Sequence, residues 1–135
     1  MYMSNAHKAK SLGGESVKTF NRSSGNVGEA IAVNHLEGEG FKIEKTNFKA
    51  KMGEVDIIAS RKGRLHFIEV KYRQTNKFGL GREAVTATKQ RTIRNVAKLY
   101  LVQNGLYNKV FVSFDVIEIM GSFQDYKLEH LVGCF

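Results

Sequence analysis

Three charged side chains in neighbouring segments have the types and spacing that metal-assisted hydrolysis needs. Asp56 lies in the segment Gly53–Ser60, and Glu69 and Lys71 lie in the segment Arg64–Tyr72. Both segments are rich in β-branched and aromatic residues, which is typical of β-strands. The tight-turn residues between the two segments predict that they pair as an antiparallel hairpin.

The register of this hairpin decides which side chains meet. If Lys62 and Gly63 form a two-residue turn, opposed residues have numbers that sum to 125. Asp56 then shares one face with Glu54 and Ile58, because side chains alternate along a strand. The opposed pairs on that face are Asp56–Glu69, Glu54–Lys71 and Ile58–Phe67, and those on the reverse face are Val55–Val70 and Ile57–Ile68.

An acid directly opposite another acid is unfavourable unless a proton or a cation lies between them. Opposed Cβ atoms are about 5 Å apart, where Asp56 and Glu69 would repel. Mg²⁺ or Mn²⁺ would resolve the conflict, and Lys71 could orient a metal-bound water and offset phosphate charge. Phosphodiester hydrolysis needs this combination. The alternative is a solvated charged face with an ordinary Glu54–Lys71 pair.

Positive charge is concentrated in the middle of the chain. The net charge is +8, and residues 71–98 alone carry eight bases against the single acid Glu83, a net of +7. Such a block favours a polyanionic partner, because each neutralised phosphate releases a counterion. The alternative is a solvated basic face. The bases are Lys71, Arg73, Lys77, Arg82, Lys89, Arg91, Arg94 and Lys98.

The elements that must position these residues follow from hydrophobic periodicity. A helix is expected from near Gly25 to Gly38 or Gly40, with Asn26 as N-cap and Glu29 completing a capping box. A clearer helix spans about Thr86 to Asn104 and is stopped by Gly105. Strands are expected over Phe41–Phe48, Gly53–Ser60, Arg64–Tyr72, Val110–Met120 and Phe123–His130. The order α-β-β-β-α-β-β predicts an α/β fold, a mixed sheet of about five strands flanked by helices.

Length and composition indicate a single globular domain. The 135 residues suffice for one core, which we assign to residues 23–135, with residues 1–22 as a disordered or tag-like tail. No apolar run is long enough to cross a membrane. One cysteine, Cys134, cannot form an internal disulfide, so a reducing, cytoplasmic location is expected. The histidines lack zinc-type spacing, so no zinc site is expected: they are His7, His35, His66 and His130.

Several motifs together resemble the YraN-like family of bacterial proteins. They are Gly53–Ile58, Phe67–Arg73, Glu83–Thr86 with Lys89-Gln90, Gly25-x-x-Gly28-Glu29 and Phe114–Val116. The resemblance covers about Gly25 to Phe135. That family is similar to Holliday-junction resolvases and restriction endonucleases, whose signature is Asp followed by Glu-x-Lys on adjacent strands. It therefore implies a restriction-endonuclease-like fold and a metal-dependent nuclease.

The resemblance also implies roles for individual residues. Asp56 and Glu69 would bind Mg²⁺ or Mn²⁺, Lys71 would be the water-orienting base, and Glu29 would add a carboxylate to the metal or its water shell. For Glu29 the capping-box role is an equal alternative. Asp115, in a buried strand, is expected to be structural. The residues expected to contact nucleic acid are Arg73, Lys77, Arg82, Lys89, Gln90, Arg91, Arg94 and Lys98; for Lys89 and Gln90 the alternative is a solvated first turn.

Three functional hypotheses follow from these residues. The first is an active nuclease that selects branched or irregular DNA through shape and backbone contacts; DNA is the expected partner rather than RNA. The second is a nucleic-acid-binding protein of the same fold without catalysis, and the third is a scaffold whose basic face meets an acidic protein. A homodimer would suit a two-strand cutter by analogy with resolvases. The presence of Asp56, Glu69 and Lys71 together favours the active nuclease, because carboxylates repel DNA unless a metal neutralises them.

Overall fold

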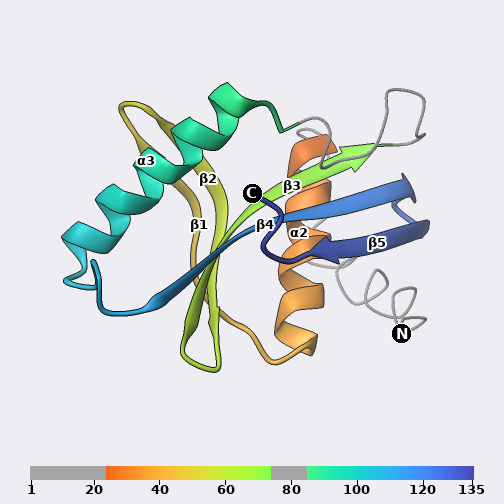
Figure 1. Ribbon diagram of the computed structural model, residues 1–135. Coiled ribbons are helices and arrows are strands. Elements are labelled where there is room, and N and C mark those ends of the chain that lie inside the picture. The colour runs from red at the N-terminus through yellow and green to blue at the C-terminus, as the bar shows by residue number, and fades with distance from the viewer. Residues whose placement is uncertain (1–23, 74–84) are drawn as a thin grey trace.

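The protein is a mixed β-sheet with a helix on each side (Figure 1). The computed structural model describes residues 24–73 and 85–135. Its elements are α2 (Ser24–Gly38), β1 (Lys42–Ala50), β2 (Gly53–Arg61), β3 (Arg64–Arg73), α3 (Ala87–Gln103), β4 (Phe111–Ser122) and β5 (Asp125–Leu131). This order confirms the predicted α-β-β-β-α-β-β arrangement. The expected tail, 1–22, lies outside the described residues.

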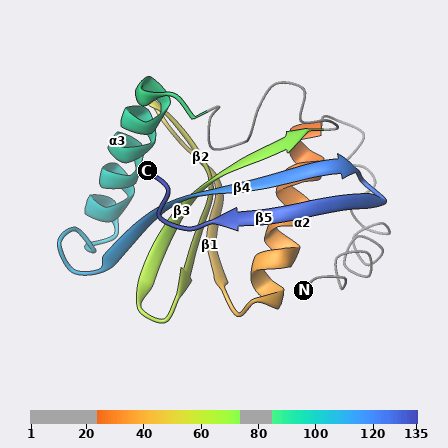
Figure 2. The ribbon, with the colours of Figure 1, turned by 45° about the vertical axis from the view of Figure 1, so that its right-hand side comes forward.

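The strands follow one another across the sheet in the order β1-β2-β3-β4-β5. Only β3 and β4 pair in parallel; the other neighbours are antiparallel. A parallel pair needs a long crossover, and α3 supplies it. Figures 1 and 2 show α3 and α2 on opposite sides of a strongly twisted sheet. The first turns of both helices lie at the same end of the molecule, where β3 ends.

Each face of the sheet has its own hydrophobic core. Under α2 the core includes Ile31, Leu36 and the strand residues Ile57 and Ile68. Under α3 it includes Ile58 and Phe67. These side chains are almost fully buried. At roughly 1.5–3 kcal/mol for each large apolar side chain, burial on both faces holds the strands in a single register.

Helix α3 matches its sequence pattern closely. Its buried residues are the predicted apolar stripe Ile93, Val96, Ala97, Tyr100 and Leu101. The Thr86 side chain accepts a hydrogen bond from the Lys89 backbone N–H at 3.1 Å, so Thr86 is the N-cap. Gly105 has φ 68°, the left-handed conformation that ends a helix after its C-cap.

Helix α2 begins earlier than the sequence pattern predicts. It starts at Ser24, so Asn26 lies inside the helix and the capping box of Asn26 and Glu29 is wrong. The physical reason is packing. Val27 is buried in the core and Gly28 packs against β3, which places these residues within the helix rather than at its start. Glu29 is therefore not needed as a cap.

The β2–β3 hairpin has the predicted turn and, near the turn, the predicted register. Lys62 and Gly63 have φ of 53° and 76°, as a two-residue type I′ turn requires. Pairs that sum to 125 run from Arg61↔Arg64 to Ile57↔Ile68, which confirms the register there. The sheet face predicted for Val55 is wrong. It packs in the core under α3, whereas Ile57 packs under α2.

The break in alternation at Val55 lies between two regular pairs of β1 and β2, Thr46↔Ile57 and Phe48↔Val55. Asn47, between them on β1, has φ 51°, a left-handed conformation that turns the strand locally. On the other side of β2, the Asp56 side chain accepts a hydrogen bond from the Val70 backbone N–H. The Asp56 carboxylate thus takes the place of a backbone acceptor in the β2–β3 ladder.

Candidate active site

The Asp56 carboxylate lies where β2 and β3 part. Its Oδ2 accepts a hydrogen bond from the Val70 backbone N–H at 2.9 Å, which ties it to the residue beside Glu69. Asp56 is partly buried. The two acids that the sequence places in one register are therefore close in space. The Asp56 side chain is joined to β3 by this hydrogen bond, and Asp56 and Glu69 are not paired in the backbone ladder.

Glu69 is the most deeply buried acid of the site, with 5% of its side chain exposed. Its Oε2 lies 3.4 Å from Lys71 Nζ and 3.4 Å from Lys89 Nζ. Lys89 is in the first turn of α3, so this helix contributes to the site directly. The expected pairing of Glu54 with Lys71 is wrong, because Lys71 contacts Glu69 instead.

Asn47 is a site residue that the sequence analysis missed. Its Nδ2 donates to Glu29 Oε2 at 2.6 Å and to Glu54 Oε2 at 3.1 Å. Through this amide, α2, β1 and β2 are joined at one point, and Glu29 is held beside the other acids. Asparagine tolerates the left-handed conformation at position 47 better than most residues, which was the one available signal.

Burial and neighbouring acids together raise carboxylate pKa values at this site. Burial, followed by the charge of Glu69, raises the pKa of Asp56 to about 7, against a hydrogen bond from Val70 that acts in the opposite direction. Burial likewise raises the pKa of Glu29; Asn47 opposes this shift, and the charges of Glu54 and Glu69 add to it. A site that resists full ionisation of its own acids has an excess of negative charge, which a bound cation would relieve.

The donor set fits a hard divalent cation. Glu29, Asp56 and Glu69 offer carboxylate oxygens, and the charges of Glu69 and Glu29 both act on Asp56, after burial, to raise its pKa. Mg²⁺ and Mn²⁺ prefer such oxygen ligands and retain water in the remaining positions. Asp56 and Glu69 would hold the ion, with Glu29 bound to it or to its water shell.

The raised pKa of Asp56 predicts how the metal-free protein responds to pH. The folded state holds a proton that the unfolded state releases near 3.8, so the free energy of unfolding should fall as pH rises from about 4 to about 7. The slope from one such group is at most about 1.4 kcal/mol per pH unit. Thermal unfolding at about pH 5 and about pH 8 measures it, and the slope should shrink in Asp56→Asn. An unchanged slope in that variant would contradict the assignment.

Helix α2 approaches the site closely because residue 28 is glycine. A Cβ at Gly28 would lie 2.8 Å from Tyr72 Cβ and 3.5 Å from Val70 Cγ1. Neither atom is the end of a flexible side chain. The helix therefore needs glycine here to bring the next residue, Glu29, over β3.

We expect Gly28→Ala to destabilise the protein by about 1–3 kcal/mol, because the added methyl group forces α2 away from β3. It should also weaken divalent-metal binding, since Glu29 moves with the helix. Chemical denaturation and isothermal titration with Mn²⁺ measure the two effects. Glu37→Ala, an exposed position in the same helix, is the control and should change stability by less than about 0.5 kcal/mol. Equal stability of both variants would show that α2 does not depend on the close approach.

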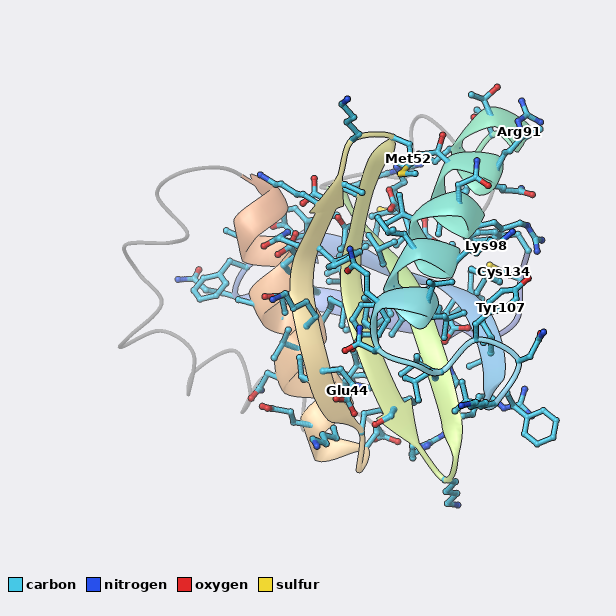
Figure 3. All side chains as sticks on the ribbon, turned by 90° about the vertical axis from the view of Figure 1, so that its left-hand side faces the viewer. Glu44, Met52, Arg91, Lys98, Tyr107 and Cys134 are labelled. Atoms are coloured by element: carbon cyan, nitrogen blue, oxygen red, sulfur yellow. The ribbon has the colours of Figure 1, made fainter. Side chains whose placement is uncertain are left out.

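The residues expected to contact nucleic acid differ in their contacts and positions in the structure. Lys89 lies at the site, and Gln90 donates to the Val85 carbonyl at 3.0 Å and so braces the start of α3. Arg94 lies over the Phe114 ring, 4.9 Å from its centroid, and Lys98 over the Tyr107 ring at 5.5 Å. Figure 3 shows Arg91 at the upper end of α3 and Lys98 further down the same side, beside Tyr107. Arg73 ends β3, and Lys77 and Arg82 lie outside the described residues.

Asp115 has the structural contacts expected of it. Its Oδ1 accepts hydrogen bonds from Ser113 Oγ at 2.6 Å and from the Gly133 backbone N–H at 3.0 Å. Its Oδ2 is 2.7 Å from a ring nitrogen of each of two histidines, His66 and His130. Burial opposes ionisation, but these hydrogen bonds outweigh it and hold the pKa of Asp115 well below its usual range.

Comparison with known proteins supports the family resemblance that the sequence motifs indicate. The model of the family described as "Uncharacterised protein family UPF0102" matches residues 28–119. The chain belongs to this family. The YraN-like resemblance of the motifs is thereby confirmed. The matched UPF0102 region contains each carboxylate and lysine of the site, from Glu29 to Lys89.

Relatives in the UPF0102 family share much of the sequence. The chain is 48% identical to a UPF0102 protein of Clostridium perfringens (strain 13) over 103 residues, which are 76% of this chain and 84% of the relative. It is 38% identical to a UPF0102 protein of Alkaliphilus oremlandii over 117 residues, 86% of this chain and 100% of the relative. A UPF0102 protein of Clostridium botulinum (strain Hall) is 42% identical over 100 residues, 74% of this chain and 81% of the relative.

The sequence is expected to contain no segment that crosses a membrane. Neither α2 nor α3, the helices within the described ranges, is long and apolar enough to span a bilayer.

Proposed function

We propose that the protein is a Mg²⁺- or Mn²⁺-dependent nuclease that hydrolyses phosphodiester bonds in DNA. The observation that supports this most directly is the pairing of Lys71 and Lys89 with the buried Glu69, each at 3.4 Å, beside two further acids, Glu29 and Asp56, whose pKa values are raised by burial and by the charge of Glu69. A structural role does not require buried acids whose charges conflict. A site that binds a metal ion and then a phosphate does require such acids.

Each residue has a defined task in this proposal. A divalent ion supplies a polarised water and charge stabilisation at the attacked phosphate. Asp56 and Glu69 would bind that ion, and Asn47 holds the Glu29 side chain by a hydrogen bond. Lys71, with its Nζ 3.4 Å from Glu69, is placed to orient the attacking water. Lys89 is 44% exposed, so it can leave Glu69 and bind a phosphate oxygen when the substrate arrives.

The basic residues of α3 extend from this site along the helix. Lys89 is at the carboxylates, and Arg91, Arg94 and Lys98 follow on exposed positions of the same helix. A duplex or branch flank lying along α3 would place its phosphates beside these cations and its scissile bond at the acids. Such contacts read backbone shape rather than base sequence.

Cleavage assays with defined substrates test the proposal. The full chain is incubated with four-way, flapped, single-stranded and linear DNA, and with matched RNA, in Mg²⁺, in Mn²⁺ and in a chelator. We expect metal-dependent cleavage of DNA, with the branched substrates preferred. Tight binding without cleavage on any substrate would favour the non-catalytic binding protein. No binding to either nucleic acid would favour a protein partner.

Binding should depend strongly on salt. Replacing Arg91 and Lys98 with glutamine should weaken DNA binding and reduce the slope of log K against log salt by about 2, because each lost phosphate contact contributes about 0.9. Fluorescence anisotropy in Ca²⁺ or chelator measures binding without cleavage. Lys42→Gln, on the exposed edge of β1, is the control and should leave the slope unchanged. An unaltered slope in the double variant would place the DNA on another surface.

A further inference from the structure

We propose that His66, Asp115 and His130 form a zinc site that is separate from the carboxylate site. One potential ligand atom of each residue lies within 4.8 Å of the other two. The residues come from β3, β4 and β5, which are neighbours in the sheet. The spacing of the histidines in sequence gave no sign of this, because only strand pairing brings them together.

Sheet register places the three side chains on the same face. His66 pairs with Ser113, so Asp115, two residues further along β4, points the same way. Ile117 pairs with His130, which puts the second histidine on that face as well. The Phe41 ring packs against both imidazoles, with centroids 5.0 Å from His66 and 5.7 Å from His130. The cluster is thus fixed by backbone pairing and covered by an aromatic ring.

The charge of the cluster favours a cation. Asp115 is fully buried, with 0% of its side chain exposed, and within residues 24–73 and 85–135 its recorded ion pairs are both with these histidines. Asp115 is the one acid of the cluster, and its carboxylate is the buried anion. Buried charges are costly unless they are paired or bind a metal. A divalent ion would replace this buried anion with a cation shared among three ligands.

The donor types select zinc over magnesium. Two imidazole nitrogens and one carboxylate oxygen form a common zinc ligand set, which leaves a fourth position for water. Mg²⁺ prefers oxygen ligands throughout. The other oxygen of Asp115 is held by Ser113 and the Gly133 amide. Such outer contacts orient a carboxylate toward a metal and leave Oδ2 to bind it.

The two distances from the imidazoles to Asp115 can be compared with those of a zinc complex. His66 Nδ1 and His130 Nε2 each lie 2.7 Å from Asp115 Oδ2. Tetrahedral ligands at about 2.0 Å from zinc are about 3.3 Å apart, so each distance must open by about 0.6 Å. The proton of each imidazole moves to its other ring nitrogen, since the metal takes the lone pair. His130, 12% exposed, is on the side from which an ion can enter.

Cobalt and zinc titrations of the full chain test the site. The carboxylate site is first removed by Asp56→Asn with Glu69→Gln, so that metal bound there does not contribute. After chelator treatment, Co²⁺ should give the visible absorption of a tetrahedral ion at one equivalent, and Zn²⁺ should displace it. Zn²⁺ at 100 times its Kd should raise Tm by about 5 °C or more.

Histidine variants show where the metal binds. On the same background, His130→Gln should lower Zn²⁺ affinity by about 100-fold or more, whereas His35→Gln, a histidine in α2, should not change it. If His130→Gln does not fold, X-ray absorption of the zinc-loaded background decides, and it should show two imidazole ligands. No tetrahedral cobalt signal, an all-oxygen zinc shell or equal affinity in His130→Gln would overturn the site and leave a hydrogen-bonded cluster. The result does not depend on whether the protein cleaves DNA.

Discussion

Asp56→Asn is expected to lower the rate of metal-dependent DNA cleavage by about 10³-fold or more while the protein remains folded. Asparagine keeps an oxygen that can accept the hydrogen bond from Val70, so the position of the side chain between β2 and β3 is preserved. It removes the negative charge that would bind the ion together with Glu69. Initial rates on the preferred substrate, measured at saturating Mn²⁺ and Mg²⁺, give the effect.

The same substitution should have the opposite effect on stability. In the metal-free protein at about pH 8, wild-type Asp56 is ionised against Glu69, and asparagine relieves this repulsion. The variant should therefore be equally stable or more stable, by about 1 kcal/mol. Asp125→Asn, an exposed acid at the start of β5, is the matched control and should alter neither rate nor stability. Loss of activity together with loss of stability would mean that Asp56 serves the fold rather than the chemistry.

Lys71→Ala is expected to lower the cleavage rate by about 10²-fold or more without weakening metal binding. Its ammonium group lies 3.4 Å from Glu69, where it would compete with the proposed divalent ion for the same carboxylate. Removing it should leave Mg²⁺ affinity unchanged or raise it. This separates Lys71 from Asp56, whose substitution should weaken metal binding. Single-turnover cleavage and isothermal titration measure the two quantities.

Two lysine variants complete the comparison. Lys109→Ala, exposed and remote in sequence from the site, should behave as wild type. Lys89→Ala should weaken substrate binding more than it slows the single-turnover rate, because Lys89 is proposed to bind phosphate. Near-wild-type cleavage by Lys71→Ala would contradict its role as the water-orienting group and would shift that role to Lys89.

The fold was largely predictable because its main signals are local. The apolar stripe of α3, its stop at Gly105 and the Lys62–Gly63 turn each depend on residues a few positions apart. The turn then determines the pairing of Ile57 with Ile68. These patterns are sufficient to predict the order of elements and the proximity of Asp56 to Glu69.

The details of the site depend on longer-range packing that periodicity does not encode. Alternation fails at Val55 because Asn47 adopts a left-handed conformation and Asp56 bonds to Val70. The capping pattern at Asn26 was misleading because α2 already begins at Ser24. The cluster of Asp115 with His66 and His130 joins three strands, so it could not be predicted without knowing that β4 pairs with β5.

The parallel pairing of β3 with β4 has a consequence for how the molecule is made. Glu69 pairs with Val116, 47 positions later in the chain, and Lys71 with Glu118. During synthesis, therefore, β3, the strand with Glu69 and Lys71, emerges well before the neighbour that completes its hydrogen bonding. Long-range contacts of this kind slow folding. A ribosome-bound chain that ends before β4 would carry Glu69 and Lys71 on an open sheet edge, so the proposed cleavage activity should appear only after β4 is released.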